Sequence, residues 1–261
     1  MPFEHIQGIR YYTFEIFSGL NLRQGVFTRR GGVSPSPWES LNVGGTVGDE
    51  RSRVLENRRR SLQALEIATD SVIDSWQVHG NAVVVAECPR GSDSDLCKAD
   101  GILTPQANLT LMMRFADCVP IFLFDPGCSA IGLVHAGWKG TLLDVVGAAV
   151  RRMSAEFGSD PADILAGIGP SIGPDHYEVG DEIISKVGEQ FEGESDRVLR
   201  NESGRTFMNL WEANRILLGR AGVRSIEIAG ICTACNLGDW FSHRAEAGVT
   251  GRFAAIIQRT G

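Results

Sequence analysis

The chain has 261 residues, of which 43% are hydrophobic and 22% charged, so its composition is that of a folded globular protein. Its net charge of −7, with no lysine and arginine cluster to offset it, argues against a nucleic-acid partner. The N-terminal residues lack the pattern of a signal peptide, and no apolar run reaches the roughly 18 residues of a membrane span. Six scattered cysteines suggest free thiols or metal ligands in a reducing compartment. We therefore expect a cytoplasmic protein without a membrane partner.

The first half of the chain predicts short strands and one helix. Strands are expected at 9–14 and 25–28, and glycine and proline exclude a helix from the loop at 29–37. Apolar residues at a spacing of three to four predict a helix at 49–68, and its basic cluster Arg58 to Arg60 is interpreted as a solvated face. Apolar strands are then expected at 71–76, 82–86, 109–113, 119–124 and 130–134.

The second half predicts a more helical pattern. Helices are expected at 141–157, 181–191 and 209–221, with Asn209 as the N-cap of the last. Strands are expected at 164–168, 225–229 and 253–257. Because strands outnumber helices and often follow one another directly, we predict a mixed sheet in one α/β (α+β) domain that spans residues 1–261.

Three residues stand where an apolar, strand-like run gives way to glycine or proline, namely His79, Cys118 and His135. Two imidazoles and one thiolate form the ligand set of a catalytic zinc whose fourth position stays open. The spacing of the three is weakly specific on its own, because a lone buried cysteine or histidine usually fills the core. Cys232-Thr-Ala-Cys235 has no second pair of this kind elsewhere in the chain and is interpreted as structural.

Several longer blocks carry a resemblance that supports the zinc interpretation. They are Gln77-Val-His-Gly80, Ala99-Asp-Gly101, Ala116-Asp-Cys-Val-Pro120, Val134-His-Ala-Gly-Trp138 and Gly167-Ile-Gly-Pro170. With them, nearly the whole chain resembles the YfiH family, long described as multicopper polyphenol oxidase or laccase-domain proteins. The resemblance implies a four-layer α/β/β/α fold with mixed sheets. It also implies that His79, Cys118 and His135 bind zinc and carry the catalysis, with copper as the alternative metal.

The resemblance further implies an activity on purine nucleosides. The reactions are phosphorolysis of adenosine, inosine and 5′-methylthioadenosine, and deamination of adenosine, so the expected partners are a purine nucleoside and phosphate. A zinc with three protein ligands lowers the pKa of a bound water to about 7, which suits deamination. We expect a monomer or a small homo-oligomer.

Residues near these motifs are candidates for the remaining roles. Asp117 is a candidate to orient an imidazole or to shuttle a proton, and His176 is a second candidate shuttle. Phosphate and ribose would be held by Arg29, Lys139 and Asn42, with Arg30 and Arg244 ranked lower. Phe115 and Trp138 are candidates to stack on the purine.

Three other functions remain open from the sequence. A Cys118–His135 hydrolase or amidase would use the thiol as the nucleophile, and the family resemblance implies that it would edit peptidoglycan precursors. A non-catalytic protein would use the metal for stability, with His176 as a fourth ligand. A copper-dependent polyphenol oxidase (laccase) would need many paired histidines, whereas the chain has five histidines and no His-x-His.

Overall fold

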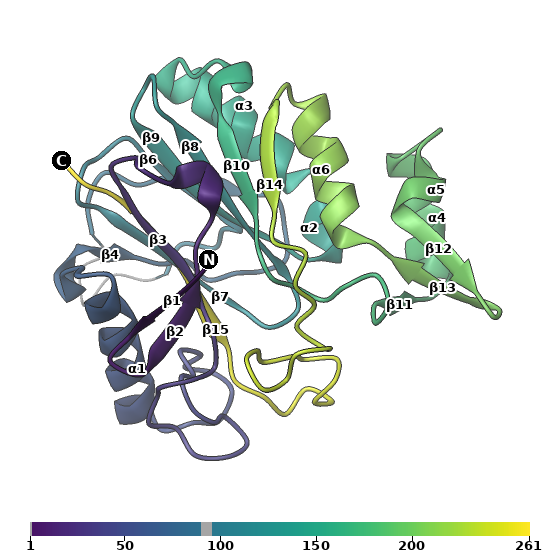
Figure 1. Cartoon of the computed structure of the whole chain (residues 1–261). Helices are drawn as coiled ribbons and strands as arrows, with labels where there is room; N and C mark the ends of the chain where they lie inside the picture. The colour runs from purple at the N-terminus through teal and green to yellow at the C-terminus, as the bar shows by residue number, and fades with distance from the viewer. Residues whose placement is uncertain (1, 90–95) are drawn as a thin grey trace.

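Two six-stranded sheets stacked face to face form the body of the protein (Figure 1). The computed structural model describes residues 2–89 and 96–261. The first sheet has the order β1 (Phe3–Ile6), β2 (Ile9–Tyr12), β3 (Leu22–Phe27), β15 (Phe253–Arg259), β7 (Thr110–Phe115), β4 (Val72–Ile73). The second has the order β14 (Ser225–Ile228), β10 (Leu165–Ile168), β8 (Val119–Asp125), β9 (Ala130–Ala136), β6 (Gly101–Thr104), β5 (Val83–Val85). Antiparallel pairs dominate both, but β4–β7, β5–β6 and β10–β14 are parallel, so the sheets are mixed as predicted.

Helices cover the two outer faces. Helix α1 (Arg51–Ala64) lies on the first sheet, and α2 (Trp138–Leu142), α3 (Val145–Phe157) and α6 (Leu210–Arg220) lie on the second. Strand β15 shows how the layers are built, because its alternate side chains enter different cores. Phe253, Ala255 and Ile257 pack between the sheets, whereas Ala254 and Ile256 face the layer of α1. The predicted four-layer α/β/β/α fold is confirmed.

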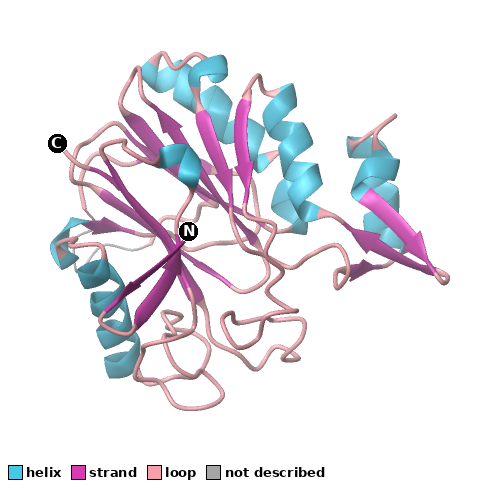
Figure 2. Cartoon of the chain, in the orientation of Figure 1, coloured by secondary structure: helices cyan, strands magenta, loops and turns pink. Residues whose placement is uncertain are grey.

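A small lobe extends from the second layer of helices, at the right of Figure 2. It holds a three-stranded sheet in the order β11 (Glu178–Val179), β13 (Arg205–Met208), β12 (Leu199–Glu202), with α4 (Asp181–Gln190) and α5 (Ser195–Val198). Buried residues of the lobe, among them Val187, Phe191 and Met208, belong to the same apolar cluster as α3 and α6. The lobe is therefore packed onto the body of the protein.

The sequence-based elements differ from the structure at identifiable points. Strands β1, β6, β11, β12 and β13 were not predicted. The helix expected at 141–157 is divided into α2 and α3, because Asp144 between them adopts the left-handed conformation with φ of 55°. Asn209 caps α6 as predicted, since its side chain accepts a hydrogen bond from the Glu212 amide.

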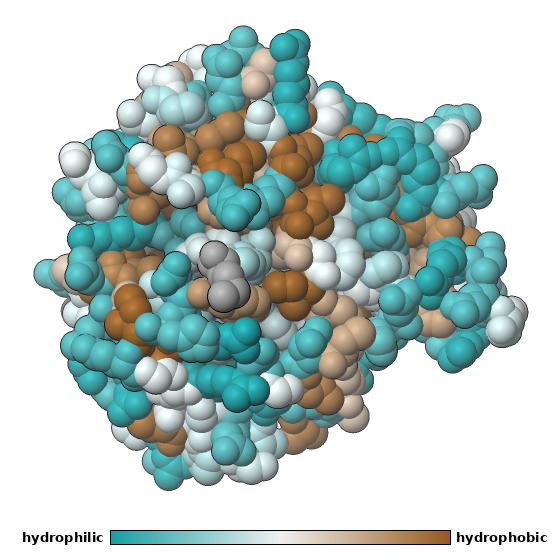
Figure 3. Space-filling view, in the orientation of Figure 1, coloured by the Kyte–Doolittle hydropathy of each residue, from teal (hydrophilic) through white to brown (hydrophobic). Residues whose placement is uncertain are grey.

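The surface is mixed in character. Hydrophilic residues cover most of the face drawn in Figure 3, and apolar residues form separate patches, one of them over the strands β10 and β14. No helix in the described part of the chain combines the length and apolar character needed to cross a bilayer.

Candidate active site

The buried carboxylate of Asp100 fixes the position of His135. Asp100 precedes β6, and His135 lies in the neighbouring strand β9. The carboxylate oxygen Oδ1 lies 2.8 Å from Nδ1 of His135, and the His135 amide donates to the Asp100 carbonyl at 2.7 Å. With Nδ1 held by Asp100, Nε2 of His135 is left as the ring nitrogen for a metal.

The same carboxylate also shapes the turn that carries His79. It accepts hydrogen bonds from the amides of Val78, His79 and Gly80 at 3.2, 3.0 and 2.7 Å. This clamp holds His79 in the left-handed region with φ of 59°, where a residue other than glycine is uncommon. Asp100 therefore orients both histidine-bearing segments.

Cys118 lies in the short connection between β7 and β8, where the chain passes from one sheet to the other. Asp117 before it has φ of 79°. Its carboxylate accepts hydrogen bonds from Thr233 Oγ1 and from the Arg244 amide, both at 2.6 Å. These bonds tie the Cys118 turn to the C-terminal loops.

The three predicted ligands converge. The ligand atoms of His79, Cys118 and His135 all lie within 4.8 Å of one another, and the two imidazole rings are 4.9 Å apart. Gly137 leaves the room that this arrangement needs, because a Cβ there would lie 2.8 Å from Sγ of Cys118 and 3.1 Å from His79. A soft thiolate with two imidazoles fits zinc and also copper, so the donor set suits a metal but does not choose between these two.

In the absence of a metal, the thiol and the imidazole form a charged pair. Burial raises the pKa of Cys118, but the neighbouring His135 and His79 outweigh it and bring the pKa down to about 6. Burial lowers the pKa of His135, but the Cys118 thiolate and the Asp100 carboxylate raise it to about 9. Near neutral pH the pair is therefore thiolate and imidazolium, which favours both metal binding and nucleophilic chemistry.

The trio lines a cavity of about 770 Å³. The side chains of Asp117, Trp138 and Tyr177 also line it. Its remaining wall is strongly basic, with five arginines: Arg51, Arg58, Arg114, Arg244 and Arg252. The cavity is of a size typical of sites for small molecules, and its charge suits an anionic ligand.

Four of the five arginines of the cavity fall into two groups. Arg58 and Arg114 pair with the buried Asp74 at 3.6 and 2.9 Å, so their positive charge is partly neutralised within the protein. The guanidinium groups of Arg244 and Arg252 donate to carbonyl oxygens but have no carboxylate partner among the described residues. These two are the better candidates for binding an anion.

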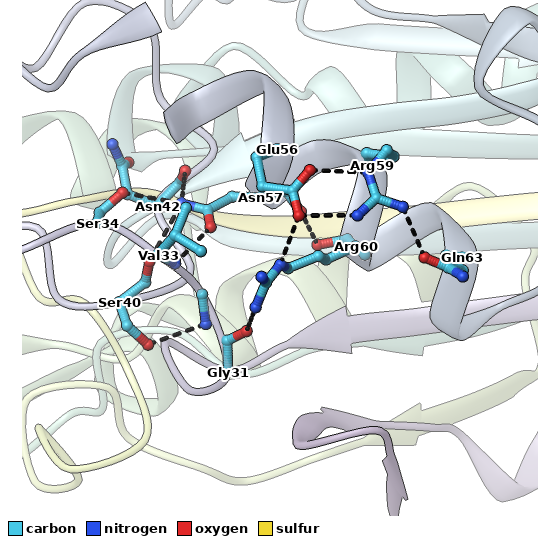
Figure 4. A network of polar contacts seen from close by, with 12 residues as sticks. Gly31, Val33, Ser34, Ser40, Asn42, Glu56, Asn57, Arg59, Arg60 and Gln63 are labelled. Carbon is cyan, nitrogen blue, oxygen red and sulfur yellow. Dashed lines mark hydrogen bonds and ion pairs between the residues drawn. The ribbon is translucent and has the colours of Figure 1, made fainter. Parts of the chain in front are cut away.

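Two predicted substrate contacts lie away from the cavity. The guanidinium of Arg29 is engaged by Glu246 at 3.0 Å and by the carbonyls of Glu39 and Leu237. Asn42 is fully buried and belongs to the network of Figure 4, in which Asn57 also holds the 33–42 loop. Both side chains stabilise loops, and their predicted contacts with phosphate or ribose stay predictions.

Three further predicted contacts lie outside the lining of the cavity and stay predictions. Phe115 is 1% exposed and packs against His135, with 5.4 Å between the rings, and it does not line the cavity. Lys139 is exposed outside the cavity, 5.3 Å from the Trp138 ring. His176 lies beside Cys232 and Cys235 and not beside the trio. Of the predicted aromatic contacts, Trp138 is the one that lines the cavity.

Functional residues were also missed in the sequence. Asp100 performs the orienting role that was predicted for Asp117. Its block Ala99-Asp-Gly101 places a carboxylate between apolar residues at the start of a strand, a signal that could have identified it. Arg252 and His243 also line the cavity from C-terminal loops.

Fold and site together define a mixed α/β protein with a His–Cys–His site at the base of a basic cavity. A family model described as multi-copper polyphenol oxidoreductase laccase matches residues 23–260. The chain therefore belongs to this laccase-domain family, and the resemblance noted in the sequence is confirmed.

Curated relatives and solved structures agree with this placement. The chain is 38% identical over 244 residues to the purine nucleoside phosphorylase YlmD of Geobacillus stearothermophilus, covering 90% of this chain and 89% of the relative. It is 38% identical over 230 residues to a purine nucleoside phosphorylase of Deinococcus radiodurans, covering 88% and 86%. The crystal structure of YlmD from Geobacillus stearothermophilus superposes with a TM-score of 0.92 at 35% identity, covering 100% and 99% of the two chains. That of the Bacillus licheniformis hypothetical protein YfiH superposes with a TM-score of 0.91 at 34% identity, covering 98% of each.

Proposed function

We propose that this chain is a zinc-dependent purine nucleoside phosphorylase for adenosine, inosine and 5′-methylthioadenosine, with adenosine deaminase as a second activity. The observation that carries the proposal is the convergence of His79, Cys118 and His135 in a basic cavity. The relatives named purine nucleoside phosphorylase support the reaction class.

The basic wall supports a phosphate site. Phosphorolysis requires phosphate to be held facing C1′ of the ribose, and guanidinium groups bind phosphate through paired N–H donors. Arg244 and Arg252 are free of carboxylate partners among the described residues and lie on the loops that also position Asp117. We assign them to phosphate.

The remaining side chains of the cavity suit a nucleoside. Trp138 and Tyr177 offer aromatic surfaces against which a purine can stack. The departing base needs a proton, and His243 is an imidazole of the cavity outside the trio that can donate one. Zinc held by the trio would supply a Lewis acid that activates water or polarises an oxygen of the substrate.

The test is product analysis by liquid chromatography on protein of known metal content. Given adenosine, the enzyme should form adenine and ribose 1-phosphate only when phosphate is present, and inosine in either case. Cys118→Ala should lose both activities, whereas Cys128→Ser should keep them, because Cys128 lies in the turn at the other end of β8. Unchanged adenosine with the metal-loaded protein, or full activity of Cys118→Ala, would overturn the proposal.

Phosphate binding can be tested separately. Arg252→Gln should raise KM for phosphate by about tenfold or more, since a hydrogen bond to a charged group contributes about 1.5–3 kcal/mol. KM for the nucleoside should change less. An equal effect on both substrates would place Arg252 in a general structural role.

One observation favours a second candidate function. Without metal, Cys118, His135 and Asp100 form a thiolate–imidazolium–carboxylate series, which is the arrangement of a cysteine hydrolase or amidase. A chelator separates the two functions, because it should abolish a zinc-dependent activity and leave a thiol-dependent amidase active.

A further inference from the structure

We propose that His176, Cys232 and Cys235 form a second zinc site, separate from the trio. His176 lies in the segment 169–177 between β10 and β11. The two cysteines lie in the loop after β14. The chain thus brings together a Cys-x-x-Cys pair and a histidine from a separate segment.

The distances match those of a tetrahedral zinc site. Zn–S and Zn–N bonds of about 2.3 and 2.05 Å at a tetrahedral angle place a sulfur and a nitrogen ligand about 3.6 Å apart. In the structure, Nδ1 of His176 lies 3.5 Å from Sγ of Cys235 and 3.8 Å from Sγ of Cys232. All three ligand atoms lie within 4.8 Å of one another. Small shifts of the side chains would therefore complete the coordination.

The backbone around Cys232 is built for a thiolate. The Gly173 amide donates a hydrogen bond to Sγ of Cys232 at 3.1 Å, which stabilises negative charge on the sulfur. This contact requires glycine, because a Cβ at position 173 would lie 2.9 Å from Cβ of Cys232 and 3.1 Å from its sulfur. The segment 169–177 and the loop after β14 therefore pack closely at Gly173 and Cys232, next to the cluster of His176, Cys232 and Cys235.

Exposure of the cluster suits an ion that enters from solvent. His176 and Cys235 are exposed, whereas Cys232 is buried. Three protein ligands would leave the fourth position to water. Binding involves no change of oxidation state, since Zn²⁺ replaces thiol protons that pass to solvent.

A metal here would connect two segments that border the catalytic cavity. Ser171 bridges to Cys232, and the neighbouring Thr233 donates the hydrogen bond to Asp117 described above. Tyr177, next to His176, lines the cavity. The second zinc would therefore brace the wall against which Asp117 and Cys118 are positioned.

Zinc content of variants tests the proposal independently of catalysis. The chain would be purified from zinc-supplemented cells, dialysed and assayed by mass spectrometry of the metal. We expect about two zinc ions per chain in the wild type and about one in each of Cys118→Ala, Cys235→Ser and His176→Ala, with none in Cys118→Ala/Cys235→Ser. Cys235 and His176 are exposed, so these substitutions spare the core. Cys128→Ser is the matched control and should keep the wild-type zinc content.

The outcomes separate this proposal from the proposed function. Loss of all zinc in Cys118→Ala would overturn the second site and leave the trio intact as a zinc site. Zinc that survives in Cys118→Ala but is lost in Cys235→Ser, with no zinc attributable to Cys118 in the wild type, would support the second site and contradict zinc at the trio.

A disulfide is the competing use of the same cysteines. Alkylation of the zinc-loaded protein without reductant, followed by peptide mass analysis, should show Cys232 and Cys235 protected by zinc and alkylated after chelation. A Cys232–Cys235 disulfide that resists the chelator and yields to reductant would overturn the proposal.

Cobalt substitution gives a second readout of the proposed site. The two thiolates at this site should produce a stronger charge-transfer absorption than the single thiolate of the trio.

Discussion

At the scale of single residues, one carboxylate supports both histidines of the trio. Asp100 is fully buried, and it accepts hydrogen bonds from three successive amides of the His79 turn and contacts the His135 ring. A buried amide that loses its acceptor costs on the order of 1–3 kcal/mol. The loss of Asp100 should therefore affect folding and metal binding together.

We expect Asp100→Ala to lower the free energy of unfolding by about 3 kcal/mol. Zinc affinity should fall by about 10–100-fold, as is usual when the partner of a ligating histidine is removed. Urea unfolding and competition with a chelator measure the two effects. Asp100→Asn keeps one acceptor oxygen and should lose less of both. Wild-type stability and zinc affinity in Asp100→Ala would show that the carboxylate does not orient the site.

The positions of the candidate metal ligands could be predicted from short motifs, but their supporting residues could not. His79, Cys118 and His135 each lie where an apolar run breaks, and the structure brings all three together. The role of Asp100 depends on amides about 20 residues away in the chain, a contact that no local pattern records. Arg29 illustrates a contact that the sequence did not record: it was predicted to bind phosphate as a basic loop residue beside glycines, and in the structure it pairs with Glu246.

At the scale of elements, the division between α2 and α3 depends on Asp144. This residue has φ of 55°, and its side chain caps α3 by accepting a hydrogen bond from the Gly147 amide. The apolar pattern predicted one continuous helix because it continues on both sides of the break. A Cβ at position 147 would lie 2.3 Å from the Asp144 carboxylate, so Gly147 is part of the same cap.

We expect Asp144→Ala to destabilise the protein by about 2 kcal/mol, about half from the lost cap and half from an alanine at positive φ. Asp144→Gly loses the cap but relieves the backbone, so it should cost about half as much. Thermal and urea unfolding of both variants provide the comparison. Equal losses in the two would indicate that backbone strain contributes nothing at this position.

The predictability of the strands depends on how they are buried. Strands β8 and β9 consist of seven buried residues each and were located from their apolar runs. Strand β12 has one half-buried residue, Leu199, among exposed ones, so its pairing with β13 leaves no apolar alternation to detect. Strand β6 is buried throughout but only four residues long, which is too short for periodicity to identify.

The turn between β8 and β9 depends on pH through Asp125. Burial raises the pKa of this carboxyl, but the nearby Ser159 side chain and the hydrogen bonds from the Cys128 and Gly127 amides outweigh it, and the net effect lowers the pKa. A depressed pKa in the folded state means that the stabilisation is present above the ordinary value of about 4 and is lost as pH falls through the folded pKa.

Asp125→Asn should therefore be less stable than the wild type at pH 7, and the difference should shrink below pH of about 4. Urea unfolding across this pH range measures it. Asp70→Asn is the control, because Asp70 is exposed and its substitution should change stability little at any pH. A difference for Asp125→Asn that stays constant with pH would exclude the titration of Asp125 as its source.

At the scale of the whole molecule, the two ends of the chain have unequal roles. Strand β15 lies near the centre of the first sheet, paired with β3 on one side and β7 on the other. Strand β1 lies at the edge of the same sheet and pairs with β2 alone. Figure 1 shows both strands with the chain ends marked. Because β3 and β15 are far apart in sequence, the first sheet is complete only after the last residues have joined it.

Deletion of residues 253–261 should therefore abolish folding, whereas deletion of residues 2–6 should be tolerated. Phe253, Ile256 and Ile257 are fully buried, and burial of each contributes about 1.5–3 kcal/mol, so together they approach the roughly 5–15 kcal/mol by which a domain is stable. Residues 3–6 of β1 contribute mainly half-buried Phe3 and exposed side chains, so their loss should lower the midpoint of thermal unfolding by only a few degrees. Circular dichroism and gel filtration of the two truncated chains compare them directly. A cooperative thermal transition in the chain that ends at residue 252 would show that the two sheets do not depend on β15 for their packing.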